Sequence, residues 1–251
     1  MGEISINPKF NIHETYKKVR ILNPYRNLSG IIMPTWAGGL VSYYKMDETS
    51  GNQVIDSWGG NHGTNNGATI GVAGKIGSAV LSDGSSSNIS IENSISATKA
   101  TFNCWLKLNN HTPAPSEGLK TGLAYLNTST FSSHYPYTDG DIYLGLLNST
   151  RQTIPSSANI IADRTQWHML TITSNTITGV YKVYQNAQLV YTGTVSSFSI
   201  ASNITLLKST ANGSAPSYYL DGSMDEISLF DIDKNEGEIS DIYNNGNGTT
   251  I

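Results

Sequence analysis

A carboxylate expected on the apolar face of a strand is the first candidate for chemistry in this sequence. Residues 218–230 read YYLDGSMDEISLF, in which Asp221 and Gly222 indicate a turn and the following residues indicate a strand. Alternate side chains of a strand point the same way, so we expect Asp225 to share a face with Ile227 and Leu229. A carboxylate there is costly unless its charge is compensated. A bound Ca²⁺ ion would compensate it, and a strand end open to water is the alternative.

Residue types that carry out catalysis show no convincing spacing elsewhere. Asp139 and Asp141 lie two residues apart without a third acid, which is more typical of a turn than of an active site. The five histidines lack metal-ligand spacing, and His168 is expected to be structural. Cys104 alternates in phase with Leu106, which indicates a small buried hydrophobe. The sequence therefore predicts no catalytic residue.

Aromatic residues in polar loops are the candidates for binding. Sugars are held by aromatic faces and by polar side chains with satisfied hydrogen bonds. Tyr135 and Tyr137 are the first choice, because a loop rich in Ser, Thr and Pro is expected to expose them. The alternative for each aromatic residue is packing on its own loop. The predicted glycan-binding residues are Tyr135, Tyr137, Trp58, Tyr218 and Tyr219.

Composition narrows the class of partner. The chain has 251 residues, a net charge of −4 and only 14% charged residues, which argues against nucleic-acid binding. No apolar run is long enough to span a membrane, and the first residues lack the apolar core of a signal peptide. A surface rich in Gly, Ser, Thr, Asn and Tyr suits sugar-like ligands and is ordinary for an extracellular or virion β-protein.

The elements that position these residues are short strands. From Trp36 onward, alternating apolar runs recur between Gly, Asn, Ser and Pro clusters, which predicts an all-β antiparallel sandwich over residues 38–251. Residues 181–191 read as a hairpin, and Ala187 in its turn disfavours the mirror-image turn types, which need positive φ. One short helix is predicted at 235–243, capped by Asn235.

Residues 1–37 differ from the rest of the chain. They hold three prolines and several basic residues without a regular period. We interpret them as an N-terminal arm that packs on the main domain or on another chain. A disordered leader or an extra strand of the same domain is the alternative.

Several segments together are similar to a known family. In order along the chain they are 41–51, 54–63, 74–84 (GKIGSAVLSDG), 102–107 (FNCWLK), 167–171 (WHMLT) and 221–243. They resemble the concanavalin A-like lectin/glucanase superfamily, in its laminin-G-like branch, over residues 38–248. The resemblance implies a jelly roll of two antiparallel sheets. It also implies a structural Ca²⁺ held by Asp47, by the turn at Asp83 and Gly84, and by Asp225.

The resemblance also bears on function. The carboxylate motif of the hydrolase members is absent, which favours a non-catalytic, lectin-like structural or adhesion protein. We expect a phage virion component, in the virion or outside the cell. Residues 1–37 would contact other virion proteins or a second copy, and the jelly roll would bind cell-surface or extracellular glycans. A secreted bacterial carbohydrate-binding module or lectin is the alternative, and a glycoside hydrolase is less favoured.

Overall fold

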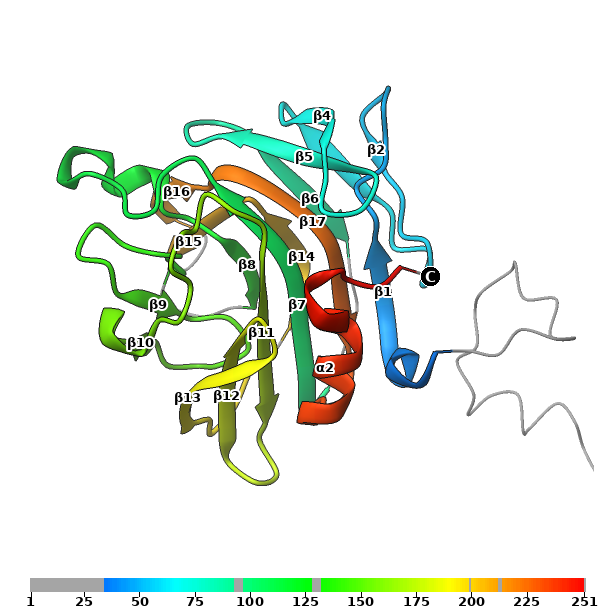
Figure 1. Ribbon diagram of the computed structural model, residues 1–251, viewed down its shortest axis with the longest axis vertical. Helices are drawn as coiled ribbons and strands as arrows, with labels where there is room; N and C mark the ends of the chain where they lie inside the picture. The colour runs from blue at the N-terminus through cyan, green and yellow to red at the C-terminus, as the bar shows by residue number, and fades with distance from the viewer. Residues whose placement is uncertain (1–33, 93–96, 128–131, 199, 212–213, 251) are drawn as a thin grey trace, which may run out of the picture. The chain divides into compact units, whose positions relative to one another are not determined.

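Short antiparallel strands dominate the computed structural model, as the sequence predicts (Figure 1). It describes residues 34–92, 97–127, 132–198, 200–211 and 214–250. Two main sheets and two short ribbons make up the fold, with one α-helix near the C-terminus. None of the helices in these ranges is long and apolar enough to span a lipid bilayer.

The larger sheet has eight strands. Seven follow the order β13-β12-β11-β7-β17-β5-β4, and β1 pairs with β17 beside them. Their bounds are β1 (Leu40–Tyr44), β4 (Thr69–Ala73), β5 (Ser78–Asp83), β7 (Lys99–Leu108), β11 (His168–Asn175), β12 (Val180–Gln185), β13 (Gln188–Thr194) and β17 (Asp221–Phe230).

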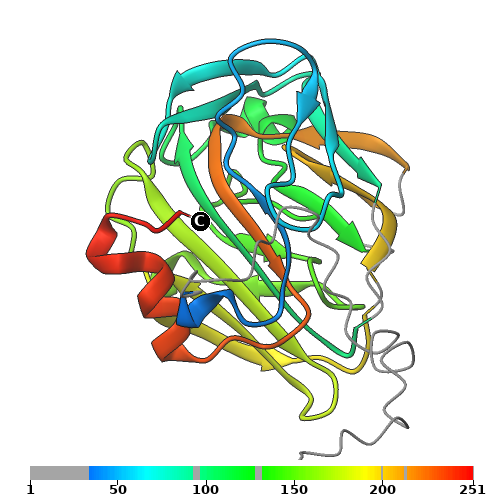
Figure 2. The same ribbon diagram turned by 90° about the vertical axis from the view of Figure 1, so that its right-hand side faces the viewer.

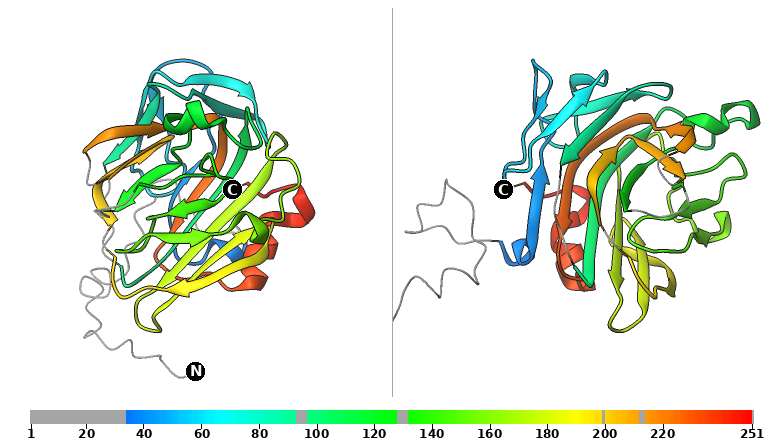
Figure 3. Two further views of the ribbon diagram at one scale, coloured as in Figure 1. Left: turned by 90° about the vertical axis from the view of Figure 1, so that its left-hand side faces the viewer. Right: turned by 180° about the vertical axis from the view of Figure 1, so that it is seen from behind.

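The smaller sheet has five strands in the order β2-β3-β6-β14-β8, and it faces the larger one (Figure 3). Its strands are β2 (Gln53–Val54), β3 (Gly63–Asn66), β6 (Asn88–Glu92), β8 (Ala124–Asn127) and β14 (Ile200–Leu206). Apolar side chains of both sheets, such as Ile89 and Phe102, fill one main core. Cys104 lies in that core and is fully buried, as predicted.

The connections contribute two ribbons and four 3₁₀ turns. The ribbons are β9 (Ile142–Leu144) with β10 (Gln152–Ile154), and β15 (Lys208–Ala211) with β16 (Ser214–Tyr219). The turns are η1 (Thr35–Ala37), η2 (Pro115–Lys120), η3 (Ser156–Ala158) and η4 (Asn244–Gly246).

Strand β17 is the centre of the larger sheet (Figure 2). It pairs with β7 on one side, while β5 and β1 share its other side. A bulge lies between Asp225 and Ser228, where the partner changes, and Glu226 has a φ of 47°. The extra residue shifts the alternation, so Ile227 and Leu229 face the main core and Asp225 does not. The prediction that these three share a face was wrong.

A second apolar cluster covers the outer face of the larger sheet. Helix α2 (Glu236–Tyr243) packs there with Trp36 and Ala37 of η1, and with Trp105 of β7. The predicted helix is confirmed, including its Asn235 cap. Trp36 and Ala37 are buried, although the expected boundary placed them in the arm, so the domain begins before Trp36. The rest of the arm, residues 1–33, lies outside the described residues.

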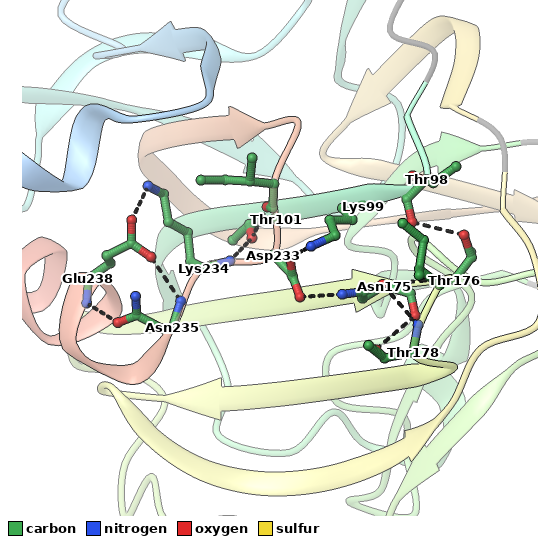
Figure 4. A network of polar contacts seen from close by, with 12 residues as sticks. Thr98, Lys99, Thr101, Asn175, Thr176, Thr178, Asp233, Lys234, Asn235 and Glu238 are labelled. Atoms are coloured by element: carbon green, nitrogen blue, oxygen red, sulfur yellow. Dashed lines mark hydrogen bonds and ion pairs between the residues drawn. The ribbon is translucent and has the colours of Figure 1, made fainter.

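Polar contacts fix the segment between β17 and α2 (Figure 4). Lys234 is buried, and its Nζ donates to Gly38 O at 2.6 Å and to Glu238 Oε1 at 2.8 Å. Asp233 pairs with Lys99 at 3.0 Å and accepts from Asn175 at 2.6 Å. These contacts tie the helix to β7, β11 and the N-terminal end of the domain.

Candidate functional site

A ladder of loop segments holds His134 between two neighbours. His134 forms isolated antiparallel bridges with Gly122 and with Tyr143 of β9. Its N–H donates to Tyr143 O at 2.7 Å, and Tyr143 N–H donates back to His134 O at 3.1 Å. On the other side, Tyr135 N–H donates to Thr121 O at 3.0 Å. The backbone of His134 is therefore hydrogen-bonded to Tyr143 on one edge, and its neighbour Tyr135 fixes the segment on the other.

Three half-buried tyrosines meet the His134 ring, and we call these four residues the His134 cluster. Ring centroids lie 4.5 Å from His134 for Tyr218, 4.9 Å for Tyr137 and 6.3 Å for Tyr143, all in edge contacts. Gly122 stands opposite His134, and a Cβ there would lie 2.0 Å from Tyr218 O. Glycine at that position therefore lets β16 approach and bring Tyr218 to the histidine.

Charged groups lie beside the cluster. Asp139 Oδ2 accepts from Tyr143 Oη at 2.7 Å, and this contact raises the pKa of Tyr143 to about 12. The guanidinium of Arg151 lies 4.7 Å over the Tyr143 ring. Asp139 Oδ1 accepts from Asp141 N–H at 2.9 Å, and Asp141 Oδ1 accepts from Ser156 N–H at 2.7 Å. The Asp139–Asp141 pair forms a turn, as the sequence indicates.

His134 is neutral at physiological pH. It is 4% exposed, and burial, together with the positive charge of Arg151, lowers its pKa to about 4. Thr121 Oγ1 lies 2.7 Å from its Nδ1, and Ser132 Oγ lies 2.8 Å from its Nε2. Both ring nitrogens therefore have partners, and the polar demands of the buried ring are met within the protein.

The comparison with family models identifies the fold family. A laminin-G-like model, described as "Concanavalin A-like lectin/glucanases superfamily", matches residues 82–240, which is more than half of the chain. The chain belongs to this superfamily. The jelly roll that the sequence motifs imply is confirmed. The comparison with curated proteins gave no match.

Similar solved structures include a domain of an extracellular enzyme and the binding domains of toxins. Domain 4 of an extracellular arabinanase from Geobacillus stearothermophilus, in complex with arabinotriose, shares 20% identity at a TM-score of 0.57, covering 80% of this chain and 97% of that one. The binding domain of Paraclostridial Mosquitocidal Protein 1 shares 14% sequence identity at a TM-score of 0.63, and the match covers 84% of this chain and 53% of that one. The binding domain of botulinum neurotoxin DC in complex with SialylT shares 14% sequence identity at a TM-score of 0.58, and the match covers 82% of this chain and 51% of that one. The chain thus spans about half of the toxin domains.

The structure brings together two of the predicted glycan-binding residues of this laminin-G-like domain. Tyr137 and Tyr218 both contact His134. His134, which belongs to the candidate aromatic run 134–137 but is not among the five chosen residues, completes the cluster with Tyr143, which was missed. Their only sequence signals are the aromatic run at 134–137 and the alternation after Asp141.

The other three predicted residues lie elsewhere. Tyr135 is buried, stacks on His168 at 5.7 Å and accepts from Gln185 Nε2 at 3.1 Å, so the expectation that its loop exposes it was wrong. It follows His134 in an extended segment, and its side chain therefore points the opposite way, into the core. Trp58 packs on the second apolar cluster. Tyr219 lies beside Lys208, with 5.5 Å between Nζ and the ring centroid.

Backbone N–H groups surround the carboxylate of Asp225. Its side chain is 0% exposed, which contradicts the alternative of a strand end open to water. Oδ2 accepts from Lys75 N–H at 2.7 Å and Ile76 N–H at 3.1 Å, and Oδ1 accepts from Glu226 N–H at 2.9 Å. Burial nevertheless raises the pKa of Asp225 to about 7. The Asp225 carboxylate therefore supplies the acceptors for three backbone N–H groups at the point where the partner of β17 changes from β5 to β1.

The residues implied as calcium ligands do not form one group. In the described ranges, no three His, Cys, Asp or Glu side chains are placed to hold a metal ion. Asp83 accepts from three serines at 85–87, which hold its pKa well below the usual range, and Gly84 supplies positive φ for that turn. The negative charge of Asp47 contributes to the raised pKa of Asp225. Of the implied ligands, Asp47 and Asp225 influence each other electrostatically, and a calcium ion between them stays a prediction.

Proposed function

We propose that this chain is a non-catalytic carbohydrate-binding domain whose glycan site is the His134 cluster. The observation that carries the proposal is the convergence of Tyr137, Tyr143 and Tyr218 on one neutral, hydrogen-bonded histidine. Sugars present C–H faces that pack on aromatic rings, and hydroxyl rims that need donors and acceptors.

The cluster supplies both kinds of contact. The ring centroids of Tyr137 and Tyr218 each lie within 5 Å of His134, so neighbouring sugar rings of one chain can reach both tyrosines. Asp139, which accepts from Tyr143 Oη, and Arg151, which lies over the Tyr143 ring, add a carboxylate and a guanidinium near the cluster that can bond hydroxyls.

The comparisons support binding rather than hydrolysis. The arabinanase domain, crystallised with arabinotriose, is matched over nearly its whole length, and the toxin neighbours are binding domains. In this chain Asp139 and Asp141 are both engaged in their turn and with Ser156. A glycosidase would instead need two carboxylates on either side of a bound glycosidic bond.

Two settings for such a domain follow from the sequence. The first is display on a phage virion through residues 1–37, and it stays a prediction because it depends on the arm. The second is a carbohydrate-binding module of an extracellular bacterial protein. The near-complete match to the arabinanase domain favours this second setting.

A glycan array tests the proposal. We expect the full chain to bind a subset of glycans, with arabino-oligosaccharides and sialylated glycans among the probes. The Tyr137→Ala/Tyr218→Ala double variant should lose that binding. Tyr219→Ala is the matched control, because this neighbour of Tyr218 lies against Lys208 and outside the cluster. Equal binding by the double variant and the control would overturn the site assignment.

A further inference from the structure

The hydrogen bonds around His134 determine which of its nitrogens carries the proton. Thr121 Oγ1 donates to Gly118 O at 2.8 Å and lies 2.7 Å from His134 Nδ1. A hydroxyl has only one proton, so Thr121, which donates that proton to Gly118, must accept from the histidine. Nδ1 is therefore the protonated nitrogen. Nε2 has the lone pair and accepts from Ser132 Oγ at 2.8 Å.

We infer that His134, held as the neutral Nδ1–H tautomer by Thr121 and Ser132, is the positioning residue of the glycan site. The inference rests on the proposed function. The buried ring is the surface on which the tyrosine edges pack, and the two hydroxyls prevent it from rotating or changing tautomer. His134 acts on the ligand through the tyrosines, since only 4% of its own surface is exposed.

The fixed neutral ring of His134 determines how glycan affinity depends on pH. The titratable and charged groups that face His134 are Tyr137, Tyr143, Tyr218, Arg151 and Asp139. Protonation of Nε2 would require an acceptor there, and Ser132 would have to turn its proton away. Because burial and Arg151 lower the pKa of His134 to about 4, this step lies far below neutral pH. Glycan affinity is therefore independent of histidine protonation between about pH 5.5 and 8.

The variant that isolates positioning is Thr121→Val. Thr121 is buried, and the substitution keeps the shape of its side chain while removing the oxygen that accepts from Nδ1–H. No group that touches the ligand changes. Ser209→Ala is the control, because Ser209 is also a buried hydroxyl, but its oxygen accepts from the Ser133 backbone N–H and not from His134 Nδ1.

Long-range ¹H–¹⁵N NMR of the histidine rings in the full chain tests the tautomer without any ligand. We expect a protonated Nδ1 and an unprotonated Nε2 at His134, with no titration between pH 5.5 and 8. In Thr121→Val the two tautomers should mix, and nuclear Overhauser contacts from the ring to Tyr137 and Tyr218 should weaken. An Nε2–H tautomer in the wild type, or titration near pH 6.5, would overturn the inference.

Titration with arabinotriose and with the strongest array ligand completes the test. Thr121→Val should bind severalfold more weakly than the wild type, and Ser209→Ala should bind equally well. Undiminished affinity of Thr121→Val with mixed tautomers would contradict a positioning role. A wild type with the Nδ1–H tautomer that binds no glycan would instead refute the proposed function, and the positioning role with it.

Discussion

Two regions of this molecule bury polar groups at irregular backbone, with opposite outcomes. At the His134 cluster both nitrogens of the buried ring have partners, and the surrounding tyrosines stay half-exposed. At the bulge of β17, Asp225 and Glu226 are 0% and 2% exposed. Tyr43 Oη donates to Glu226 Oε2, while Glu226 Oε1 has no hydrogen-bond partner in the part of the chain that is described. The first region keeps half-exposed aromatic rings, which we propose bind a glycan, and the second uses its polar groups to hold the sheet.

Asp225→Ala, at the bulge, is expected to cause the largest loss of stability, and it should separate the two regions most clearly. The substitution leaves the N–H groups of Lys75, Ile76 and Glu226 without their acceptor. Each buried N–H group left without a partner costs about 1–3 kcal/mol. We therefore expect the free energy of unfolding, measured by urea denaturation, to fall by about 3 kcal/mol or more. Asp47→Ala is the control, because this exposed carboxylate accepts one hydrogen bond within the described residues, from Ser78 N–H, so its loss should cost about 1 kcal/mol. Similar losses in both variants would contradict the account of the bulge.

The pH dependence of stability is expected to be an effect of similar size. Burial raises the pKa of Glu226 from 4.5 to about 8, so the folded state favours the protonated acid. Its contribution is fully present below about pH 4.5 and is lost as the pH rises through about 8. The unfolding free energy should fall by up to about 1.4 kcal/mol per pH unit in that window. Asp225, whose pKa is about 7, adds a change of the same sign.

Glu226→Gln isolates this contribution, because the amide is neutral at every pH. The slope of unfolding free energy against pH should be shallower in the variant, with only the Asp225 part left. Urea titrations from pH 5 to 8.5 measure both slopes. A variant as steep as the wild type would show that Glu226 is not the titrating group, and glycan affinity should not change in either protein.

Single tyrosine substitutions should give a smaller effect, confined to binding. Tyr137→Ala and Tyr218→Ala each remove one aromatic face, worth about 1–1.5 kcal/mol, which weakens glycan affinity roughly tenfold. Their urea midpoints should stay close to that of the wild type, since both rings are half-buried. Calorimetric titration checks the affinities. A loss of stability that accounts for the lost binding would place these tyrosines with the bulge, as structural residues.

Calcium is expected to have the smallest effect. Burial is the main cause of the raised pKa of Asp225, and the negative charge of Asp47 adds to it. A cation between the two carboxylates would relieve their repulsion, so added Ca²⁺ should raise the melting temperature by a few degrees relative to EDTA. Asp47→Asn should abolish the shift, and Asp83→Asn should retain it, because the Asp83 carboxylate already accepts from its own serines. An unchanged melting temperature in the wild type would refute the site.

The sequence predicted what depends on local patterns. The alternation of apolar residues predicted the strands and the burial of Cys104, and the capping residue Asn235 predicted the start of α2. The hairpin was predicted, but its turn was not, because Asn186 and Ala187 both adopt positive φ, at 49° and 63°. A pair of 2.9 Å hydrogen bonds between Asn186 and Met169 compensates for this backbone strain.

What depends on distant partners could not be predicted. The bulge at Glu226 arises where β5 gives way to β1 beside β17, and the alternation of 221–230 contains no sign of that exchange. The His134 cluster draws on three separate segments joined by single bridges, so residue spacing could not reveal it. Aromatic residues in polar loops pointed to Tyr137 and Tyr218, whose role in binding stays a prediction, but the pattern could not separate the buried Tyr135 from the half-buried Tyr137.

The most direct test of the glycan site is a ¹H–¹⁵N correlation titration of the full chain with its strongest array ligand. We predict that amide shifts concentrate in residues 132–143, around Thr121 and Gly122, and at Tyr218 and Tyr219. Residues 74–78 and 224–227 at the bulge should not shift. Shifts centred on the bulge, near Trp58, or on β11 and β12 would contradict the assignment of glycan binding to the His134 cluster.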